Sequence, residues 1–376
     1  MSAHLTQDQT LLQDAAERYL RDSYDFNQRR ERIAEGVYSD PKQWQAFAEM
    51  GWLALPVAEE FGGLGMGTRE MAILAELCGQ FLVTEPLIDA LAAAHAIIGV
   101  SQQQESLLPR VAEGELIPVA AIDEAETASR LTPATALTHT DEGWHLSGAK
   151  HWISAGASAT HLTVLAQSED GLAWVLVPTT TDGVECDSFP THDGRGGMNC
   201  RFDLVLEADH ILLQGQPAAD ALEAYRALAM TLSSAETLGA TQAALDTTVD
   251  YTKQRVQFGQ PLASFQALQH RMSNMLIQTE LTRSLIYAAC NAADSGRDDA
   301  ARFARAATVK ATTVGRKVSQ EAIQLHGGIA TTDEYIVGHF FKRITALESW
   351  VCSKGCLLYT SPSPRDATLS RMPSSA

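Results

Sequence analysis

Apolar residues recur at helical spacing through the first third of the chain. One such stripe begins at Leu11 and ends at Tyr19, and residues 71–82 contain another. A period near 3.6 residues is typical of helices that bury one face. We therefore expect helices from residue 5 to about residue 115, which form an N-terminal helical domain over residues 1–116.

The pattern changes in the middle of the chain. Between residues 117 and 213, short apolar runs such as 161–166 and 172–177 are separated by Asp-Gly and Glu-Gly pairs. Such pairs are typical of the tight turns of β-hairpins. We therefore expect a small β-domain over residues 117–215.

Helical spacing returns from Ala218 to about Lys354, which predicts a C-terminal helical domain over residues 216–355. Helices and strands thus occupy separate parts of the chain, so the predicted fold class is α+β. Residues 356–376 are rich in Ser and Pro and have no periodicity, so we expect a disordered, non-native tail that resembles translated vector sequence.

Composition excludes several classes of protein. The net charge of -18 disfavours a nucleic-acid partner, because phosphate binding needs a clustered basic face. The apolar stretch 91–100 is too short to span a membrane. The chain does not begin with a basic segment followed by an apolar one, as a secretion signal would, so we expect a cytoplasmic protein. Its six cysteines are scattered and form no Cys-x-x-Cys pair, which favours reduced thiols over disulfides or a metal site.

The segment Arg255-Val-Gln-Phe-Gly-Gln-Pro261 interrupts a helical pattern that runs through residues 238–253. Gly frees the backbone and Pro fixes φ, so the pattern predicts a helix, a sharp break and a second helix from Ser264. Arg255 and Gln257 would then project from a helix end, where a guanidinium can bind a phosphate through two hydrogen bonds. The alternative is an ordinary solvated arginine.

Two further segments accompany this one. They are Gly148-Ala-Lys-His-Trp-Ile-Ser-Ala155 and Gln324-Leu-His-Gly-Gly-Ile329. Together, and in this order, the three segments resemble those of the acyl-CoA dehydrogenase family, and the resemblance covers the chain to about Lys354. It implies a helical domain, a small β-domain and a helical bundle, with FAD as cofactor.

The resemblance also implies roles for individual residues. Trp152 would pack on the isoalloxazine ring, and Ser154 would donate a hydrogen bond to its N5 edge. The paired glycines would let the backbone approach the cofactor across a subunit boundary. The cofactor-binding residues implied are Trp152, Ile153, Ser154, Arg255, Gln257, Phe258, Leu262, Gln266, Gln324, Leu325, Gly327 and Gly328.

The implied reaction is oxidation of an acyl-CoA to the trans-2-enoyl-CoA, with electrons passed to an electron-transfer flavoprotein. A carboxylate must remove the α-proton, and burial in an apolar pocket would raise its pKa for that task. The family position for this base falls on Val351, and the position used in other branches falls on Ala229. The catalytic base is therefore unknown from the sequence.

Two acids remain as candidates. Glu236 lies on an otherwise apolar helical stripe, where an unpaired carboxylate would be costly and hence a candidate site residue; pairing with a neighbouring helix is the alternative. Glu348 lies in an Ala-Leu-Glu segment that resembles the branch of the family that degrades sterols and their side chains. A structural ion pair is the alternative there.

Other departures from the family pattern change the expected function. Residues 122–129 lack the glycines of the family's Thr-Glu-Pro-Gly-x-Gly-Ser-Asp loop, and Ala330 stands where glycine is common. In these departures the chain resembles a divergent branch of the family in which two different subunits assemble. The resemblance therefore implies a homo-oligomer or a hetero-oligomer, either a dimer or a tetramer. The alternatives to a dehydrogenase are a non-catalytic FAD-binding subunit and a flavin oxidase or monooxygenase. The acyl chain stays open.

Overall fold

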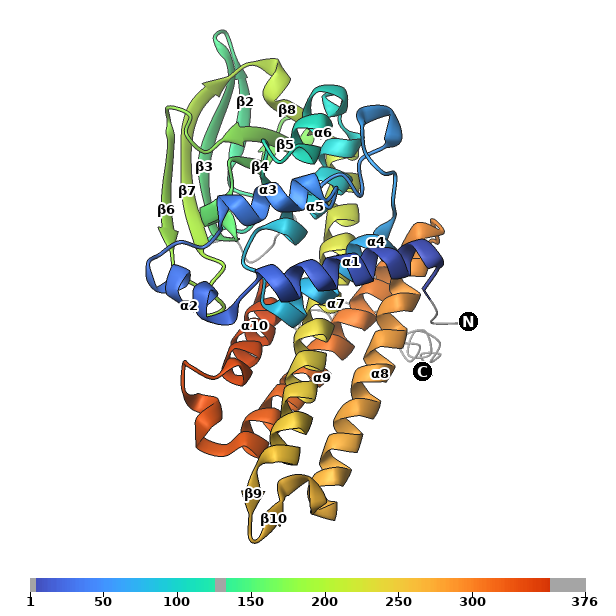
Figure 1. Cartoon of the computed structure of the whole chain (residues 1–376). Coiled ribbons are helices and arrows are strands. Elements are labelled where there is room, and N and C mark those ends of the chain that lie inside the picture. Colours follow the sequence, from blue (N-terminus) through green and yellow to red (C-terminus); the bar gives the residue numbers. More distant parts are fainter. Residues whose placement is uncertain (1–4, 126–132, 352–376) are drawn as a thin grey trace, which may run out of the picture.

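The computed structural model describes residues 5–125 and 133–351 of the chain, without the side chains of residues 350 and 351. A β-domain lies at one end of the molecule and long helices extend to the other (Figure 1). The N-terminal helices lie along the β-domain and across the junction between these two parts. They are α1 (Gln7–Ser23), α2 (Phe26–Ala34), α3 (Pro41–Glu49), α4 (Thr68–Phe81), α5 (Leu87–Ala96) and α6 (Gln104–Ala112).

The described strands of the middle domain form one sheet with the order β6-β7-β3-β2-β4-β5-β8, and β1 pairs with β4. Strands β4 and β5 are buried along most of their length, because their runs of Val, Leu and Ala are apolar on both faces. Strand β6 lies at the sheet edge. The strands are β1 (Pro118–Ala121), β2 (Ala136–Thr140), β3 (Gly143–Ser154), β4 (His161–Ser168), β5 (Gly171–Pro178), β6 (Val184–Phe189), β7 (Gly197–Leu206) and β8 (Ile211–Gln214).

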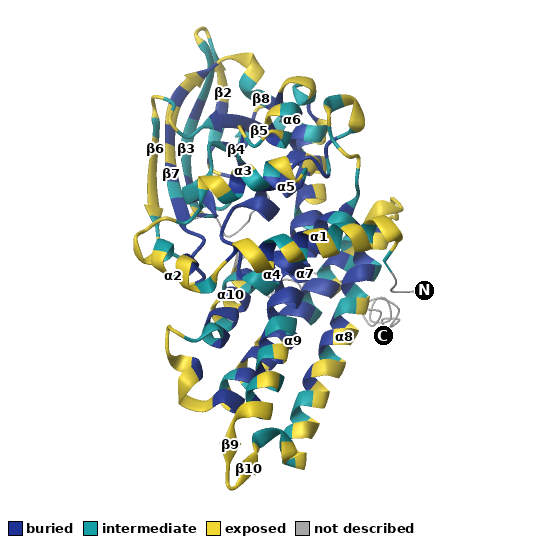
Figure 2. Ribbon diagram, viewed as in Figure 1, coloured by how far each residue is buried: buried dark blue, intermediate teal, exposed yellow. Residues whose placement is uncertain are grey.

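The C-terminal part is a bundle around one long, deeply buried helix, α7 (Gln216–Gln254) (Figure 2). Helices α4 and α7 cross at a glycine contact: a Cβ on Gly79 would lie 1.9 Å from the Glu236 carbonyl oxygen. Glycine is required there because the two backbones touch. The other elements are β9 (Val256–Gln257), β10 (Gln260–Pro261), α8 (Gln266–Asp294), α9 (Ala300–His326) and α10 (Ile336–Val351).

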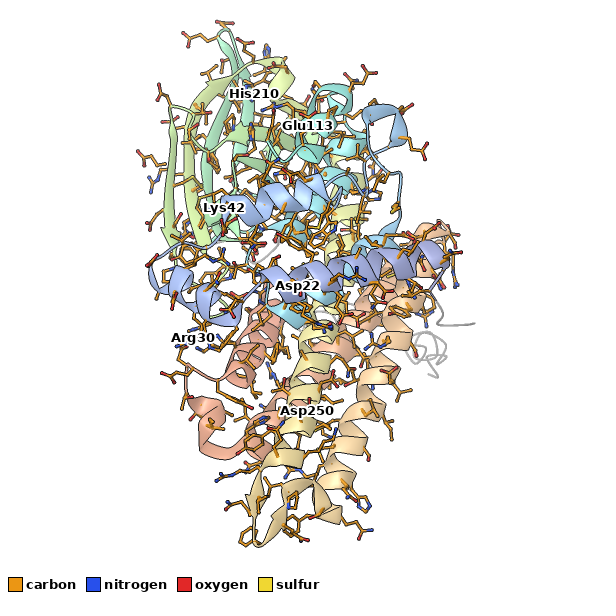
Figure 3. All side chains as sticks on the ribbon, viewed as in Figure 1. Asp22, Arg30, Lys42, Glu113, His210 and Asp250 are labelled. Carbon is orange, nitrogen blue, oxygen red and sulfur yellow. A yellow bond between two sulfur atoms is a disulfide. The ribbon has the colours of Figure 1, made fainter. Side chains whose placement is uncertain are left out.

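The predicted α+β class, with helices before and after a small sheet, is confirmed. The predicted helix start at Ser264 is wrong. Helix α8 begins at Gln266, and the Ser264 hydroxyl donates to the Pro261 carbonyl oxygen (2.6 Å) instead of capping the helix. Arg30 extends from α2 (Figure 3) and forms an ion pair with Asp333 ahead of α10 (2.9 Å), which ties the first domain to the last.

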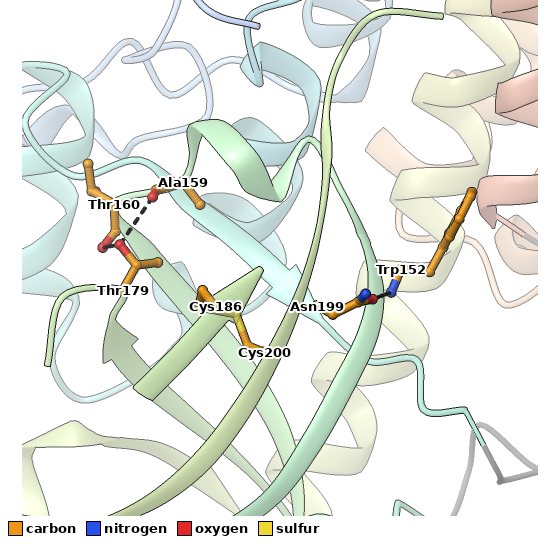
Figure 4. The surroundings of a disulfide bond; sticks show 7 residues. All are labelled: Trp152, Ala159, Thr160, Thr179, Cys186, Asn199 and Cys200. Carbon is orange, nitrogen blue, oxygen red and sulfur yellow. Dashed lines mark hydrogen bonds between the residues drawn. A yellow bond between two sulfur atoms is a disulfide. The ribbon is translucent and has the colours of Figure 1, made fainter. Parts of the chain in front are cut away.

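The expectation that no cysteine forms a disulfide is wrong for one pair. Cys186 and Cys200 face each other across β6 and β7, with Cα atoms 4.3 Å apart, and their sulfurs are bonded (Figure 4). Direct cross-strand partners come this close at non-hydrogen-bonded positions. The prediction failed because it rested on spacing along the chain, which does not report strand register.

Cys78 and Cys290 are free and buried, as expected for reduced thiols. Cys352, Cys356 and the predicted tail over residues 356–376 lie outside the described residues. None of the described helices combines the length and the apolar character needed to cross a bilayer.

Candidate functional site

Trp152 occupies an irregular end of strand β3. The pairing of β3 with β7 shifts between Lys150 and Ile153, and the Trp152 backbone is left-handed there (φ 56°). Such a φ is uncommon for a bulky residue and costs about 1–3 kcal/mol, so the surroundings must hold it. The backbone N–H of Trp152 donates to the Asn199 side-chain oxygen (2.9 Å), and the residue stays 54% exposed.

A buried ion pair supports this irregular strand end. The Lys150 ammonium donates to Glu124 (2.6 Å), with both side chains almost fully buried. Burial would raise the pKa of Glu124, but hydrogen bonds from Lys150, Ala134 N–H and Thr135 outweigh it and lower the pKa to about 2. Glu124 thus stays ionised and fixes the backbone that leads to Trp152.

The exposed face of Trp152 borders a cavity of about 330 Å³ between the β-domain and α10, which we call the ring cavity. Its lining mixes aromatic side chains with polar and charged ones, and Phe189 lies against Trp152 with 5.1 Å between ring centroids. Its size suits one aromatic ring system with a few polar contacts. The lining residues are Trp152, Ile153, Ser154, Phe189, Pro190, Thr191, His192, Asp193, Arg195, Gly197, Phe341, Lys342, Thr345, Ala346 and Ser349.

A smaller cavity, of about 60 Å³, lies on the side of Trp152 and Ser154 that faces α7. Ala229 lines this cavity. It stands at the position where the resemblance to other family branches would put the base, but its side chain is only a methyl group. Asp123 is the carboxylate among the described side chains of this lining, and it already has an interaction partner. A free acid at this cavity is therefore not provided by the described residues.

The segment that contains Arg255 forms an exposed hairpin. Strands β9 and β10 pair Gln257 with Gln260, and the turn places Phe258 in the left-handed region (φ 52°) with 91% of its surface exposed. Arg255, Gln257 and Gln266 are also exposed, and Leu262 is half-buried. Their polar groups are thus available to a molecule that approaches from outside this chain.

The paired glycines lie beside the same end of α7. Helix α9 ends at His326, where Gly327 adopts φ 69°. The His326 ring is buried and stacks on Tyr251 with 4.3 Å between centroids, near the C-terminal end of α7. Gln324, Gly327 and Gly328 are exposed, whereas Leu325 is buried in the core, so the structure does not present Leu325 to a cofactor from outside the chain.

The predicted cofactor residues therefore fall into two groups. Trp152, Ile153 and Ser154 line the ring cavity below the β-domain. The hairpin and the turn at Gly327 and Gly328, which we call the glycine turn, lie toward the opposite end of the bundle (Figure 1). One chain does not bring the two groups together. A site that uses both must combine two chains.

Glu236 is buried, with 1% of its surface exposed, but it is not unpaired. Its carboxylate binds the Arg343 guanidinium of α10 and lies 3.8 Å from Arg195. The alternative of a structural ion pair is thus correct, and the unpaired, catalytic Glu236 is not supported. A buried charge cluster results: Arg29, Asp89, Asp193, Arg195, Glu236 and Arg343.

Within this cluster the acids respond differently to burial. Burial raises the pKa of Asp89 to about 6, because Arg195, at 3.9 Å, only partly offsets the loss of water. Burial would also raise the pKa of Asp193, but Arg195 and Arg343 outweigh it and hold the pKa below its usual range. Asp193 lines the ring cavity and is consequently a weak base.

Glu348 forms an ion pair with Arg316 of α9, which again is the structural alternative. The Val351 side chain lies outside the described part of the chain. Sequence reasoning missed Asp193, Arg195 and Arg343 altogether. Asp193 and Arg195 lie in a Gly-rich turn, and Arg343 lies on a largely apolar helix. Charges in such surroundings were a signal, but no local pattern showed that the three residues meet.

Three family models match the chain in order. The acyl-CoA dehydrogenase N-terminal domain matches residues 6–115, the middle domain residues 121–207 and the C-terminal domain residues 225–351. The probable acyl-CoA dehydrogenase FadE25 of Mycobacterium tuberculosis is 28% identical over 317 residues, which cover 79% of this chain and 80% of the relative.

Solved structures give the same result. A variant of the Tcur3481-Tcur3483 steroid ACAD has a TM-score of 0.85 and 28% identity, and the match covers 94% of this chain and 96% of that one. The ChsE4-ChsE5 complex from Mycobacterium tuberculosis has a TM-score of 0.87 at 21% identity, over 100% of both chains. At that identity the second similarity shows the fold alone.

Proposed function

Because this chain belongs to the acyl-CoA dehydrogenase family, we propose that it is an FAD-dependent acyl-CoA dehydrogenase that forms a trans-2-enoyl-CoA. The observation that carries the proposal is the presentation of Trp152 and Ser154 at the ring cavity by a strained, well-supported strand end. The division into domains 1–116, 117–215 and 216–355, a cytoplasmic location and an electron-transfer flavoprotein as electron acceptor belong to the same proposal.

The residues present suit FAD. Trp152 offers a flat apolar face, Ser154 offers a hydroxyl donor, and the cavity between them and α10 has the volume of a ring system. Arg255, Gln257, Phe258 and Gln266 of a second subunit would hold the remainder, with the backbone of Gly327 and Gly328 close by. When bound, FAD would accept the hydride that leaves the substrate β-carbon.

The chain's own contribution to the reaction is then orientation and exclusion of water. The Trp152–Phe189 pair would fix one face of the ring, and a ring system bound in the cavity would displace water from it. Removal of the α-proton needs a carboxylate whose pKa is near the working pH. Asp193 does not meet this requirement, since two arginines keep its pKa low.

This deficit favours a second candidate function. In it the chain is a non-catalytic, FAD-binding subunit, and a different polypeptide supplies the base. The specific observation is that Ala229 and Val351 occupy the two base positions, so additional copies of the same chain would not fill them. The ChsE4-ChsE5 structure shows that a complex of two named proteins occurs with this fold.

The deciding experiment is anaerobic flavin bleaching with the full chain. Purified protein is mixed with short, long and steroid-side-chain acyl-CoAs, and the visible absorbance of bound flavin is followed. Bleaching by any of them supports the dehydrogenase and shows that a base exists within the chain. A yellow protein that never bleaches contradicts it and supports the non-catalytic subunit.

Two controls separate the other outcomes. Reoxidation of reduced flavin by air within seconds would identify an oxidase or monooxygenase instead of a dehydrogenase. The variant Ser154→Ala should retain flavin but bleach more slowly, because it loses only the donor at the ring edge. A protein without any flavin, even after incubation with FAD, would reject all three functions.

A further inference from the structure

Strand β6 lies at the sheet edge and contributes its last residue, Phe189, to the lining of the ring cavity. It pairs with β7 alone, and four of its residues, 185–188, are exposed. Only Val184 and Phe189 are half-buried. Edge strands with so little apolar burial separate easily from their neighbours. The Cys186–Cys200 bond is therefore a major constraint on the position of β6.

The two cysteines flank the residues that build the cavity wall. Phe189 comes three residues after Cys186 and rests on Gly197, where a Cβ would lie 2.4 Å from the Phe189 ring. Asn199 is next to Cys200 and accepts the hydrogen bond from the Trp152 N–H (Figure 4). The bond thus joins the strand that carries Phe189 to the strand that positions Trp152.

The two cysteines differ in access. Cys186 is exposed on the edge strand, whereas Cys200 is 2% exposed on β7. Attack by a thiolate on a disulfide depends on access to a sulfur. A reductant from solvent would therefore reach the bond from the β6 side.

We propose that Cys186 and Cys200 are a reversible thiol–disulfide site through which a dithiol reductant loosens the Phe189–Trp152 wall of the ring cavity. One thiolate of the reductant attacks the bond and forms a mixed disulfide, and its second thiolate then displaces the protein sulfur. The protein gains two electrons and two protons, which leave Cys186 and Cys200 as thiols. The reductant leaves as a disulfide.

The loss of the bond acts on the cavity in two ways. Strand β6 frays, so Phe189 no longer holds one face of Trp152. Asn199 also gains freedom, which weakens support for the left-handed Trp152 backbone. The effect on FAD rests on the proposed function, but the effect on the strands does not.

The first test needs no cofactor. Amide hydrogen exchange of residues 184–189 and 152–155 is compared in the oxidised full chain, after dithiothreitol, and in Cys186→Ser. Reduction should speed exchange in 184–189 by about tenfold or more, and Cys186→Ser should resemble the reduced protein and ignore dithiothreitol. Glu185→Ser, at a neighbouring exposed position, should behave as wild type.

Two results would overturn the site itself. One is alkylation of Cys186 and Cys200 in the unreduced protein, measured by mass spectrometry, which would mean that no bond forms. The other is unchanged exchange in β6 after complete reduction. Dithiothreitol treatment of the wild-type chain keeps the test valid even if Cys186→Ser fails to fold.

The second test measures FAD affinity by flavin fluorescence in the oxidised and reduced states. We expect roughly threefold to tenfold weaker binding after reduction, the range set by loss of one aromatic contact. Equal affinity despite faster exchange would overturn the link to the cavity. Faster exchange without FAD binding in either state would uphold the thiol–disulfide site and reject the proposed function.

Discussion

The two groups of predicted FAD contacts differ in how far the single chain fixes them. At the ring cavity, Trp152 is held by Asn199, by the buried Lys150–Glu124 pair and by Phe189. At the hairpin, Arg255 is exposed, and the hydrogen bonds given for it within the described residues come from its backbone. One group is preorganised, whereas the other ends in solvent.

This difference indicates where the missing order comes from. Phe258 has 91% of its surface in solvent and contacts the Phe265 ring edge-on, with 6.2 Å between centroids, so most of its apolar surface is left for a partner to cover. Catalytic and binding groups also need support from packed neighbours to hold their geometry. We infer that the hairpin acquires its support in the oligomer, and that the ring cavity already has it in the single chain.

The largest expected effect comes from breaking the buried support. Glu236→Gln removes one of the two buried carboxylates that pair with Arg343. Asp193 stays 3.1 Å from the guanidinium, but the buried cluster is left with one positive charge that no carboxylate offsets. We expect a loss of about 3–5 kcal/mol in the free energy of unfolding. Chemical denaturation of the apo-protein measures it.

The matched control is Glu348→Gln, which removes an acid of the same type from a partly exposed pair with Arg316. It should cost less than about 1 kcal/mol. Equal losses in the two variants would mean that the charge cluster does not support the ring-cavity end of the chain.

The same cluster gives stability a dependence on pH. Burial raises the pKa of folded Asp89 to about 6, against 3.8 for the ordinary group. Between these values the folded chain binds more protons than the unfolded chain, so stability from this group falls as pH rises. The fall is on the order of 3 kcal/mol at most.

Asp89→Asn cannot titrate and should remove that component. Urea denaturation at intervals from pH 4 to pH 7 would compare the slopes of the two proteins. Asp193, whose pKa is held low, contributes in the opposite sense, since its stabilisation is lost as pH falls below the ordinary value. Parallel curves for wild type and Asp89→Asn would show that Asp89 titrates normally.

A third prediction tests the division of the site between two chains. Trp152→Ala and Arg255→Ala should each weaken FAD binding by about 10-fold to 100-fold, because one removes the ring contact and the other a phosphate contact. Both positions are exposed, so neither variant should lose much stability. Mixing the two variants under conditions that exchange subunits should then restore some tight sites.

The recovery follows from geometry. In a mixed dimer, one site combines the intact Trp152 of one chain with the intact Arg255 of the other, and the second site carries both defects. Titration with FAD should show a tight fraction that neither variant shows alone. If mixing restores nothing although subunits exchange, the two groups do not form one site.

The sequence allowed some of these features to be predicted and not others. Helical and strand periods are local, so the order of helices, sheet and helices was predictable from short windows. The partner of Glu236 is 107 residues away, and no local pattern shows that Arg343 reaches it. The same limit applies to Cys186 and Cys200, whose pairing depends on the register of β6 and β7.

The hairpin shows an intermediate case. Gly and Pro in 258–261 correctly predicted a break between two helices. The second helix begins two residues later than expected, because the Ser264 hydroxyl donates a hydrogen bond to the Pro261 carbonyl oxygen instead of capping the helix. Exposure of Arg255 was also expected, whereas its lack of support from the rest of the chain became evident only in three dimensions. Tertiary contacts, and their absence, are what the local pattern leaves out.

The smallest expected effect concerns the glycine turn. A Cβ on Gly328 would meet nothing within 4 Å in this chain, and its backbone is not in the left-handed region, so Gly328→Ala should change stability by less than about 0.5 kcal/mol. If a cofactor held by a neighbouring subunit approaches this backbone, the added methyl group should weaken FAD binding a few-fold. Gly327→Ala is the contrasting variant, because φ 69° makes alanine strained and costs about 1 kcal/mol of stability even without FAD. Unfolding and FAD titration of both variants would therefore separate backbone strain from cofactor contact, and unchanged FAD affinity in Gly328→Ala would remove the turn from the proposed site.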